Sequence, residues 1–210
     1  MTRPFSANAR SIWLVSAIRP LLSNPTKILE IGLACGHFSK QLQKYFPSAE
    51  ISAVDPYIYD ANMLMDVEEN DLVFTPYRDA WSSQAALDEF FDNTILGLNP
   101  QLAPADDDLE SEDSRLYRMT SEDAVDKFDN ASLDLIYVDG DHSHDVVLSD
   151  LRLYWPKLKV GGVIAGDDYE DVHGWGVISA VDQFAAEEGL TLNVQTEEET
   201  ATRQWWFTKA

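Results

Sequence analysis

Short apolar runs alternate along this chain with segments whose apolar residues recur every three or four positions. The runs have the length of buried parallel strands, and the recurring segments have one apolar helical face. Strands are predicted at residues 28–31, 50–55, 114–120, 133–139 and 163–168, and helices at 7–23, 38–46, 87–98, 147–158 and 177–188. Two closing strands, 190–195 and 203–208, are separated only by a polar turn, which predicts an antiparallel pair. The pattern predicts an α/β fold, a seven-stranded Rossmann-like sheet with an antiparallel last strand and helices on both faces.

The 210 residues suffice for one domain with a sizeable core, and no linker or internal repeat divides them. We therefore predict a single domain over residues 1–210. Within it, residues 1–25 contribute a helix ahead of the first strand, and residues 57–113 interrupt the alternation as an insertion. The aromatic residues of this insertion indicate a lid over a binding site. Its densest acidic run, 106–113, is predicted to be an exposed loop.

The charge balance limits the partners of the protein. There are 37 Asp and Glu residues against 15 Lys and Arg, a net charge of −22, and this field repels nucleic acid and anionic membranes. No apolar run of about 18 residues is present to span a membrane. The one cysteine, Cys35, excludes an internal disulfide and favours a cytoplasmic setting. A small-molecule or glycan partner is expected, and homo-oligomer formation stays open.

The first predicted strand leads through a glycine turn into a helix. Gly32 and Gly36 interrupt the chain after the strand, and such a turn lets the backbone approach an anionic group at the start of the helix. Asp55 ends the next strand, where nucleoside-binding sheets place an acid that accepts hydrogen bonds from ribose hydroxyls. The alternative interpretation is an ordinary strand-to-helix turn without a ligand.

Three carboxylates end two later strands. Asp139 follows the run 133–138, and Asp167 and Asp168 follow the run 163–166. Because the ends of neighbouring parallel strands meet at one sheet edge, these acids are expected to converge, and oxygen ligands of this kind suit Mg²⁺. Two alternatives stay open: Asp167 caps the following segment, or Asp139 contacts only an amino group of a cofactor.

Two motifs resemble a known family. The pattern Glu30-x-Gly32-x-Ala34-x-Gly36 resembles motif I of the class I methyltransferases that bind S-adenosylmethionine, with Ala34 in place of the usual glycine. The segment 137–144, with the acids and glycines at 150–169, resembles the metal-dependent O-methyltransferases, most closely those that modify macrolide sugars. The resemblance covers residues 27–169 except the insertion at 57–113, where acceptor contacts are expected.

The resemblance implies roles for individual residues. It places Mg²⁺ on Asp139, Asp167 and Asp168, and it makes His142 the base that removes the acceptor proton, with Asp139 beside it. For the cofactor it implies the turn residues Gly32, Ala34 and Gly36, with Glu30 near the amino-acid end, Asp55 on the ribose, Ser121 and Glu122 flanking the adenine, and Asp139 at the same site. His144 is the weaker candidate base.

The function that follows is S-adenosylmethionine-dependent and Mg²⁺-dependent O-methylation of a sugar or glycoside hydroxyl. The cation lowers the pKa of the hydroxyl and orients it, and a histidine takes up its proton. One alternative is the same chemistry on a catechol-like aromatic, and another is a non-catalytic binding module with the same sheet. A nicotinamide oxidoreductase is disfavoured by the glycine spacing.

Overall fold

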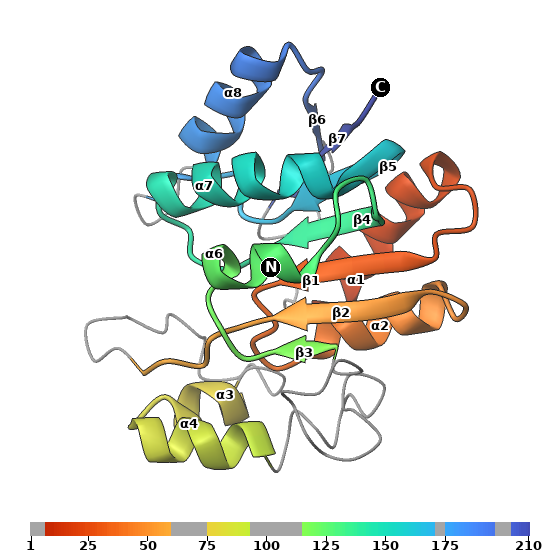
Figure 1. Ribbon diagram of the computed structural model, residues 1–210. Helices are drawn as coiled ribbons and strands as arrows, with labels where there is room; N and C mark the ends of the chain where they lie inside the picture. The colour runs from red at the N-terminus through yellow and green to blue at the C-terminus, as the bar shows by residue number, and fades with distance from the viewer. Residues whose placement is uncertain (1–6, 60–74, 93–114, 171–174, 196–202) are drawn as a thin grey trace, which may run out of the picture.

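A computed structural model describes residues 7–59, 75–92, 115–170, 175–195 and 203–210, and its centre is a seven-stranded sheet in the order β3-β2-β1-β4-β5-β7-β6 (Figure 1). The strands are β1 (Lys27–Ile31), β2 (Glu50–Val54), β3 (Leu116–Tyr117), β4 (Leu133–Val138), β5 (Leu158–Gly166), β6 (Asn193–Val194) and β7 (Trp205–Thr208). Strands β1 to β5 pair in parallel, whereas β7 is antiparallel to both β5 and β6. The predicted fold class is confirmed.

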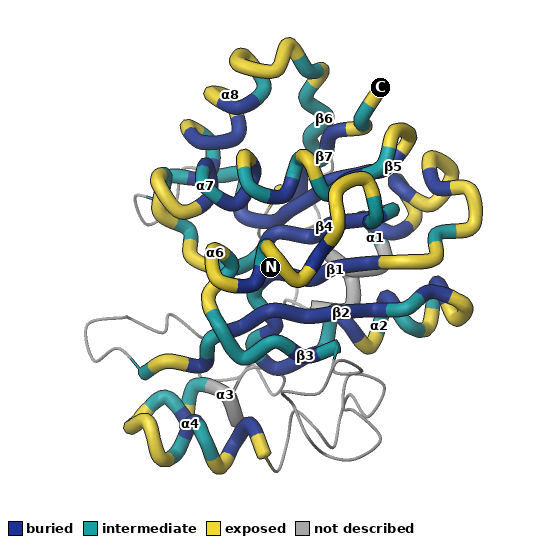
Figure 2. Tube along the Cα trace, in the orientation of Figure 1, coloured by how far each residue is buried: buried dark blue, intermediate teal, exposed yellow. Residues whose placement is uncertain are grey.

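Helices cover both faces of the sheet. They are α1 (Ala7–Ile18), α2 (His37–Tyr45), α3 (Thr75–Ala80), α4 (Gln84–Phe90), α6 (Ser121–Ala124), α7 (His144–Tyr154) and α8 (Val177–Glu188), with 3-10 turns at Arg19–Leu21, Val125–Lys127 and Trp155–Lys157. Figure 2 shows the central strands buried and the outer surfaces of the helices exposed. No helix in the described ranges has both the length and the apolar character needed to cross a bilayer.

Alternate strand residues build two separate cores. In β4, Leu135 and Tyr137 pack with α1 and α2, while Ile136 and Val138 pack with α7 and α8. Successive side chains of a strand point to opposite faces, so a strand covered on both sides is apolar at most positions. This double burial explains the short apolar runs in the sequence, in which Glu30 and Asp134 are the polar exceptions in β1 and β4.

Several boundaries differ from the sequence predictions. The first helix ends at Ile18 and continues as a 3-10 turn with Pro20 near its start, which leaves Leu21 exposed rather than on the buried face. Leu158 was predicted to close a helix, but it begins β5, because the chain after α7 passes through a 3-10 turn containing Pro156.

The insertion is described only in part. Helices α3 and α4 are two short segments of it, and α4 ends at Phe90. The predicted helical positions Ile95 and Leu98 lie outside the described residues. The acidic run 106–113 also lies outside them. The predicted strand over 114–120 is confirmed only at Leu116–Tyr117. The proposal of a lid therefore stays a prediction.

The carboxyl ends of β1 and β4 touch at Gly32. The Asp139 N–H donates to the Ile31 carbonyl at 2.8 Å, and the Gly32 N–H donates to the Val54 carbonyl at 2.9 Å. A Cβ on Gly32 would lie 2.1 Å from the Asp139 carbonyl oxygen, and the φ of Gly32 is +87°. Only glycine fits here, because both the contact and the dihedral exclude a side chain.

We predict that Gly32→Ala destabilises the protein by about 3 kcal/mol, since the Cβ forces β1 and β4 apart. The matched control is Gly161→Ala. Gly161 also has a positive φ, +79°, but nothing lies within 4 Å of its added Cβ, so it should lose only about 1 kcal/mol from the backbone. Denaturant unfolding of both variants measures the difference, and equal losses would show that the strand contact is unimportant.

Candidate functional site

The predicted site residues gather at one edge of the sheet. Glu30 lies in β1, and the glycine turn follows it; Asp55 follows β2, Asp139 follows β4, and Asp167 and Asp168 follow β5. In Figure 1 the arrowheads of β2 and β4 mark this edge on the left. Ligands of open α/β sheets bind beyond the carboxyl ends of their strands, so the fold places these residues where a ligand is expected.

Asp139, His142 and Asp168 form a compact group. One ligand atom from each lies within 4.8 Å of the others. The His142 Nε2 is 3.1 Å from Asp168 Oδ2 and 3.8 Å from Asp139 Oδ1. The His142 ring also packs edge-on against Trp175 at 4.5 Å between ring centres. Two carboxylates and an imidazole are a suitable set of donors for a divalent cation.

Asp167 does not join this group. Its Oδ1 accepts the backbone N–H of Asp168 at 2.9 Å, and its Oδ2 is 3.5 Å from the Tyr137 hydroxyl. Asp168 has a φ of +58°, a left-handed conformation that is uncommon outside glycine. Of the predicted metal set, the structure therefore brings together Asp139 and Asp168, with His142 as the third member.

The charges around His142 control its protonation. Burial favours the neutral imidazole, but the hydrogen bond to Asp139 and the negative charges of Asp168, Asp139 and Asp167 outweigh it and raise the pKa of His142 to about 9. These carboxylates therefore favour the protonated form of the imidazole. Held as an imidazolium, His142 balances the two acids that it contacts.

The turn after β1 is fixed by Asp55 and Tyr57. The N–H of Ala34 donates to Asp55 Oδ2 and the N–H of Tyr57 to Oδ1, both at 2.9 Å, while the Tyr57 hydroxyl donates to the Ala34 carbonyl at 2.6 Å. Ala34 and Tyr57 both have a φ of +46°, which is uncommon outside glycine. The usual glycine of the motif is therefore replaced by an alanine whose strained backbone is held by hydrogen bonds.

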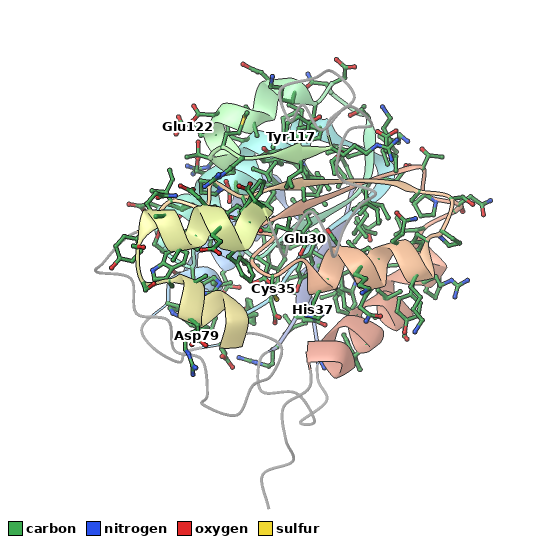
Figure 3. All side chains as sticks on the ribbon, turned by 90° about the horizontal axis from the view of Figure 1, so that it is seen from below. Glu30, Cys35, His37, Asp79, Tyr117 and Glu122 are labelled. Carbon is green, nitrogen blue, oxygen red and sulfur yellow. The ribbon has the colours of Figure 1, made fainter. Side chains whose placement is uncertain are left out.

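Glu30 is buried beneath this turn. Ser39 on α2 donates a hydrogen bond to its carboxylate. Burial raises the pKa of Glu30 well above its usual value, the Ser39 hydrogen bond opposes the rise, and the charges of Asp139 and Asp55 add to it. Figure 3 labels Glu30 together with Cys35 and His37 around the turn into α2. Cys35, in the same turn, is buried.

The predicted adenine residues lie on α6. Ser121 is the first residue of this helix and donates a hydrogen bond to Asp150 on α7, whereas Glu122 is exposed (Figure 3). Thr120, not Ser121, caps the helix, accepting the Asp123 N–H. The weaker base candidate His144 is engaged elsewhere, because its Nδ1 lies 2.7 Å from the Ser179 hydroxyl on α8.

Sequence reasoning did not single out two features beside Asp167. The indole N–H of Trp205 donates to the Asp167 carbonyl at 3.1 Å and so holds the end of β5. The second feature is a pair of buried glutamines that flank the β6–β7 pairing: the Gln195 N–H donates to the Gln204 carbonyl at 2.8 Å, and within the described residues the side-chain nitrogens of both have no hydrogen-bond partner.

Comparison with known proteins identifies the fold. A family model described as a methyltransferase domain matches residues 29–169. The superposable solved structures include a precorrin-6y C5,15-methyltransferase from Geobacter metallireducens (TM-score 0.62, 11% identity, 100% of this chain and 92% of that one). They also include the O-methyltransferase TomG of Streptomyces achromogenes in complex with SAM (0.56, 13%, 98% and 82%) and a Bacillus cereus O-methyltransferase in complex with SAH (0.54, 12%, 99% and 84%).

Two curated relatives match over short segments. The uncharacterized protein R132 of Acanthamoeba polyphaga mimivirus is 37% identical over 57 residues, which is 26% of this chain and 25% of that protein. The uncharacterized protein y4gI of Sinorhizobium fredii is 40% identical over 65 residues, 30% of this chain and 7% of the relative. The family match covers both the glycine turn and the acids that end β4 and β5. The chain therefore belongs to the methyltransferase domain family and has the class I fold of the S-adenosylmethionine-dependent methyltransferases.

Proposed function

We propose that this protein is a Mg²⁺-dependent O-methyltransferase that methylates a hydroxyl of a sugar or glycoside. The observation that carries the proposal is the group of Asp139, His142 and Asp168 beside the glycine turn. A cation at this group lies one strand away from the turn that the family uses for its cofactor, because β1 and β4 are neighbours. Methyl donor and activated hydroxyl then share one edge of the sheet.

The donors fit a divalent cation on chemical grounds. Asp139 and Asp168 supply hard oxygen ligands, and their mutual repulsion is relieved when a cation lies between them. When bound, Mg²⁺ lowers the pKa of a coordinated hydroxyl and orients its oxygen. Asp167 supports the arrangement from outside by accepting the N–H of Asp168.

His142 is the proposed proton acceptor. Its imidazole borders both acids, and it is about 30% exposed, so an acceptor molecule can reach it. Asp139 and Asp168 are the residues that would hold the cation, and their charges would then no longer favour the proton on His142. The neutral ring then takes the proton of the acceptor hydroxyl as the methyl group is transferred.

The cofactor residues follow from the turn. Asp55 accepts the backbone N–H groups of Ala34 and Tyr57 on different oxygens, and its carboxylate is the proposed acceptor for a ribose hydroxyl. Gly36, the N-cap residue of α2, has the left-handed conformation and gives this helix no side-chain cap for its first N–H groups. These groups suit the carboxylate of the amino-acid end.

The identity of residue 142 favours a sugar acceptor over a catechol-like one. Among the metal-dependent O-methyltransferases that this chain resembles, catechol-type enzymes have lysine at this position and sugar-modifying ones have histidine. The net charge of −22 makes nucleic acid and anionic membranes poor partners, and it supports a small-molecule or glycan acceptor. The buried single cysteine suits a cytoplasmic protein.

The proposal is tested by titrating S-adenosylhomocysteine calorimetrically and by following transfer of a labelled methyl group to a panel of glycosides and catechols with Mg²⁺. We expect S-adenosylhomocysteine but not NAD to bind, and label to enter glycosides. Chelation with EDTA should stop transfer and leave cofactor binding in place. Transfer that is indifferent to EDTA would exclude the metal, and labelled catechols alone would exclude the sugar.

Asp168→Asn should raise the Mg²⁺ concentration needed for half-maximal transfer at least tenfold, because it removes one charged ligand. Asp145→Asn is the matched control: Asp145 is an exposed acid in the first turn of α7 and belongs to no described metal group. The measurement is the rate of methyl transfer as a function of Mg²⁺ concentration for both variants. An unchanged Mg²⁺ requirement in Asp168→Asn would remove this residue from the metal site.

His142→Ala should lower kcat by roughly 10² to 10⁴, the usual contribution of a general base, with the affinity for S-adenosylhomocysteine unchanged. The Mg²⁺ titration of the same variant separates two roles of the imidazole. A normal Mg²⁺ requirement with low kcat identifies a base, whereas a raised requirement identifies a metal ligand. A fully active variant would exclude both.

A further inference from the structure

Two side chains of α7 contact the first residue of α6, one at its hydroxyl and one at its backbone carbonyl. The Ser121 hydroxyl donates to Asp150 Oδ1, and the Tyr154 hydroxyl donates to the Ser121 carbonyl at 2.7 Å. Asp150 and Tyr154 lie four residues apart, so both face α6 from the same side of α7. Both are buried, with 2% and 0% of their surface exposed.

Core packing does not account for an acid in this position. Burial raises the pKa of Asp150 to about 6, the Ser121 hydrogen bond opposes the rise, and the charge of Asp141 adds to it. In the described part of the chain, none of the ion pairs joins Asp150 to a lysine or arginine. A buried carboxylate without a cationic partner costs stability, so we look for the role of Asp150 in its hydrogen bond to Ser121.

The hydrogen bonds determine where α6 begins. This helix has only four residues, Ser121–Ala124, and a helix of that length does not hold its own position. It follows β3, which is bonded to the end of β2 through the Asp55 N–H and the Tyr117 carbonyl at 3.1 Å. On the other side, α7 follows β4 in the chain, and its Asp150 and Tyr154 contact Ser121. Ser121 is therefore held between the end of β3 and the helix that follows β4.

We propose that Asp150 and Tyr154 are positioning residues for the adenosine part of the cofactor, acting through Ser121. This inference rests on the proposed function, in which Asp55 binds the ribose, and on the position beside the adenine that the family resemblance implies for Ser121 and Glu122. Asp150 and Tyr154 themselves stay behind α6 and do not touch the ligand. Their two hydrogen bonds to Ser121 fix the position of the first residue of α6, and with it the position of the side chains proposed to border the adenine.

The test measures the affinity of two ligands by calorimetry: S-adenosylhomocysteine, and 5′-methylthioadenosine, which lacks the amino-acid end. Asp150→Ala and Ser121→Ala should each weaken both ligands by the same factor, roughly tenfold, as expected for one lost hydrogen bond to a charged group. The double variant should be no weaker than either single one, because both remove the same contact.

Conservative variants separate positioning from folding. Asp150→Asn keeps an oxygen that accepts from Ser121, so its affinities should stay within about threefold of the unchanged protein while its Tm is equal or higher, because the buried charge is gone. Tyr154→Phe keeps the packing of the ring and should weaken both ligands several-fold. If Asp150→Ala does not fold, these two variants provide the test.

The matched control is Arg152→Gln, which removes an exposed α7–α8 ion pair, 2.6 Å to Glu187, without reaching α6. It should bind both ligands normally. Normal binding in Asp150→Ala or Tyr154→Phe would overturn the inference and leave the proposed function standing. A loss for S-adenosylhomocysteine that exceeds the loss for 5′-methylthioadenosine would indicate general loosening and also overturn it. Failure of the unchanged protein to bind S-adenosylhomocysteine would overturn both.

Discussion

The contact between the carboxyl ends of β1 and β4 is the constraint on which the site depends. Gly32 lies so close to the Asp139 carbonyl that no side chain fits, and the Asp139 N–H is bonded to Ile31. The backbone of Asp139 is thereby fixed at the end of β4, immediately beside the glycine turn. One residue consequently belongs both to the cofactor edge and to the proposed cation group, which keeps methyl donor and acceptor together.

Charge is concentrated at this edge and is compensated locally. Glu30, Asp55 and Asp150 are buried acids whose pKa values are raised, and each is held by hydrogen bonds from a hydroxyl or from backbone N–H groups. At the opposite edge, Asp134 accepts bonds from Thr26, Lys27 and Lys159, which lower its pKa despite partial burial. Among the residues that the structure describes, no ion pair joins Glu30, Asp55 or Asp150 to a lysine or arginine, and raised pKa values of this kind gather at functional sites.

The sequence predicted most of the fold because double burial produces apolar runs such as Leu135–Val138, and because glycines mark the turn that a close contact requires. The prediction was incomplete where the outcome depends on one dihedral or on distant contacts. Asp168 has a left-handed conformation and groups with Asp139 and His142, while Asp167 accepts the Asp168 N–H, and no local pattern encodes that arrangement. The hydrogen bonds of Asp150 and Tyr154 to Ser121 join segments about thirty residues apart and left no periodic signal.

The most direct measurement of the central claim is a crystal structure of the protein grown with Mn²⁺ and S-adenosylhomocysteine, with the anomalous signal of manganese recorded. We predict a single strong anomalous peak between the Asp139 and Asp168 carboxylates, with the sulfur of S-adenosylhomocysteine on the same edge of the sheet. A bound cofactor product with no peak at these carboxylates, or with the peak elsewhere, would contradict it.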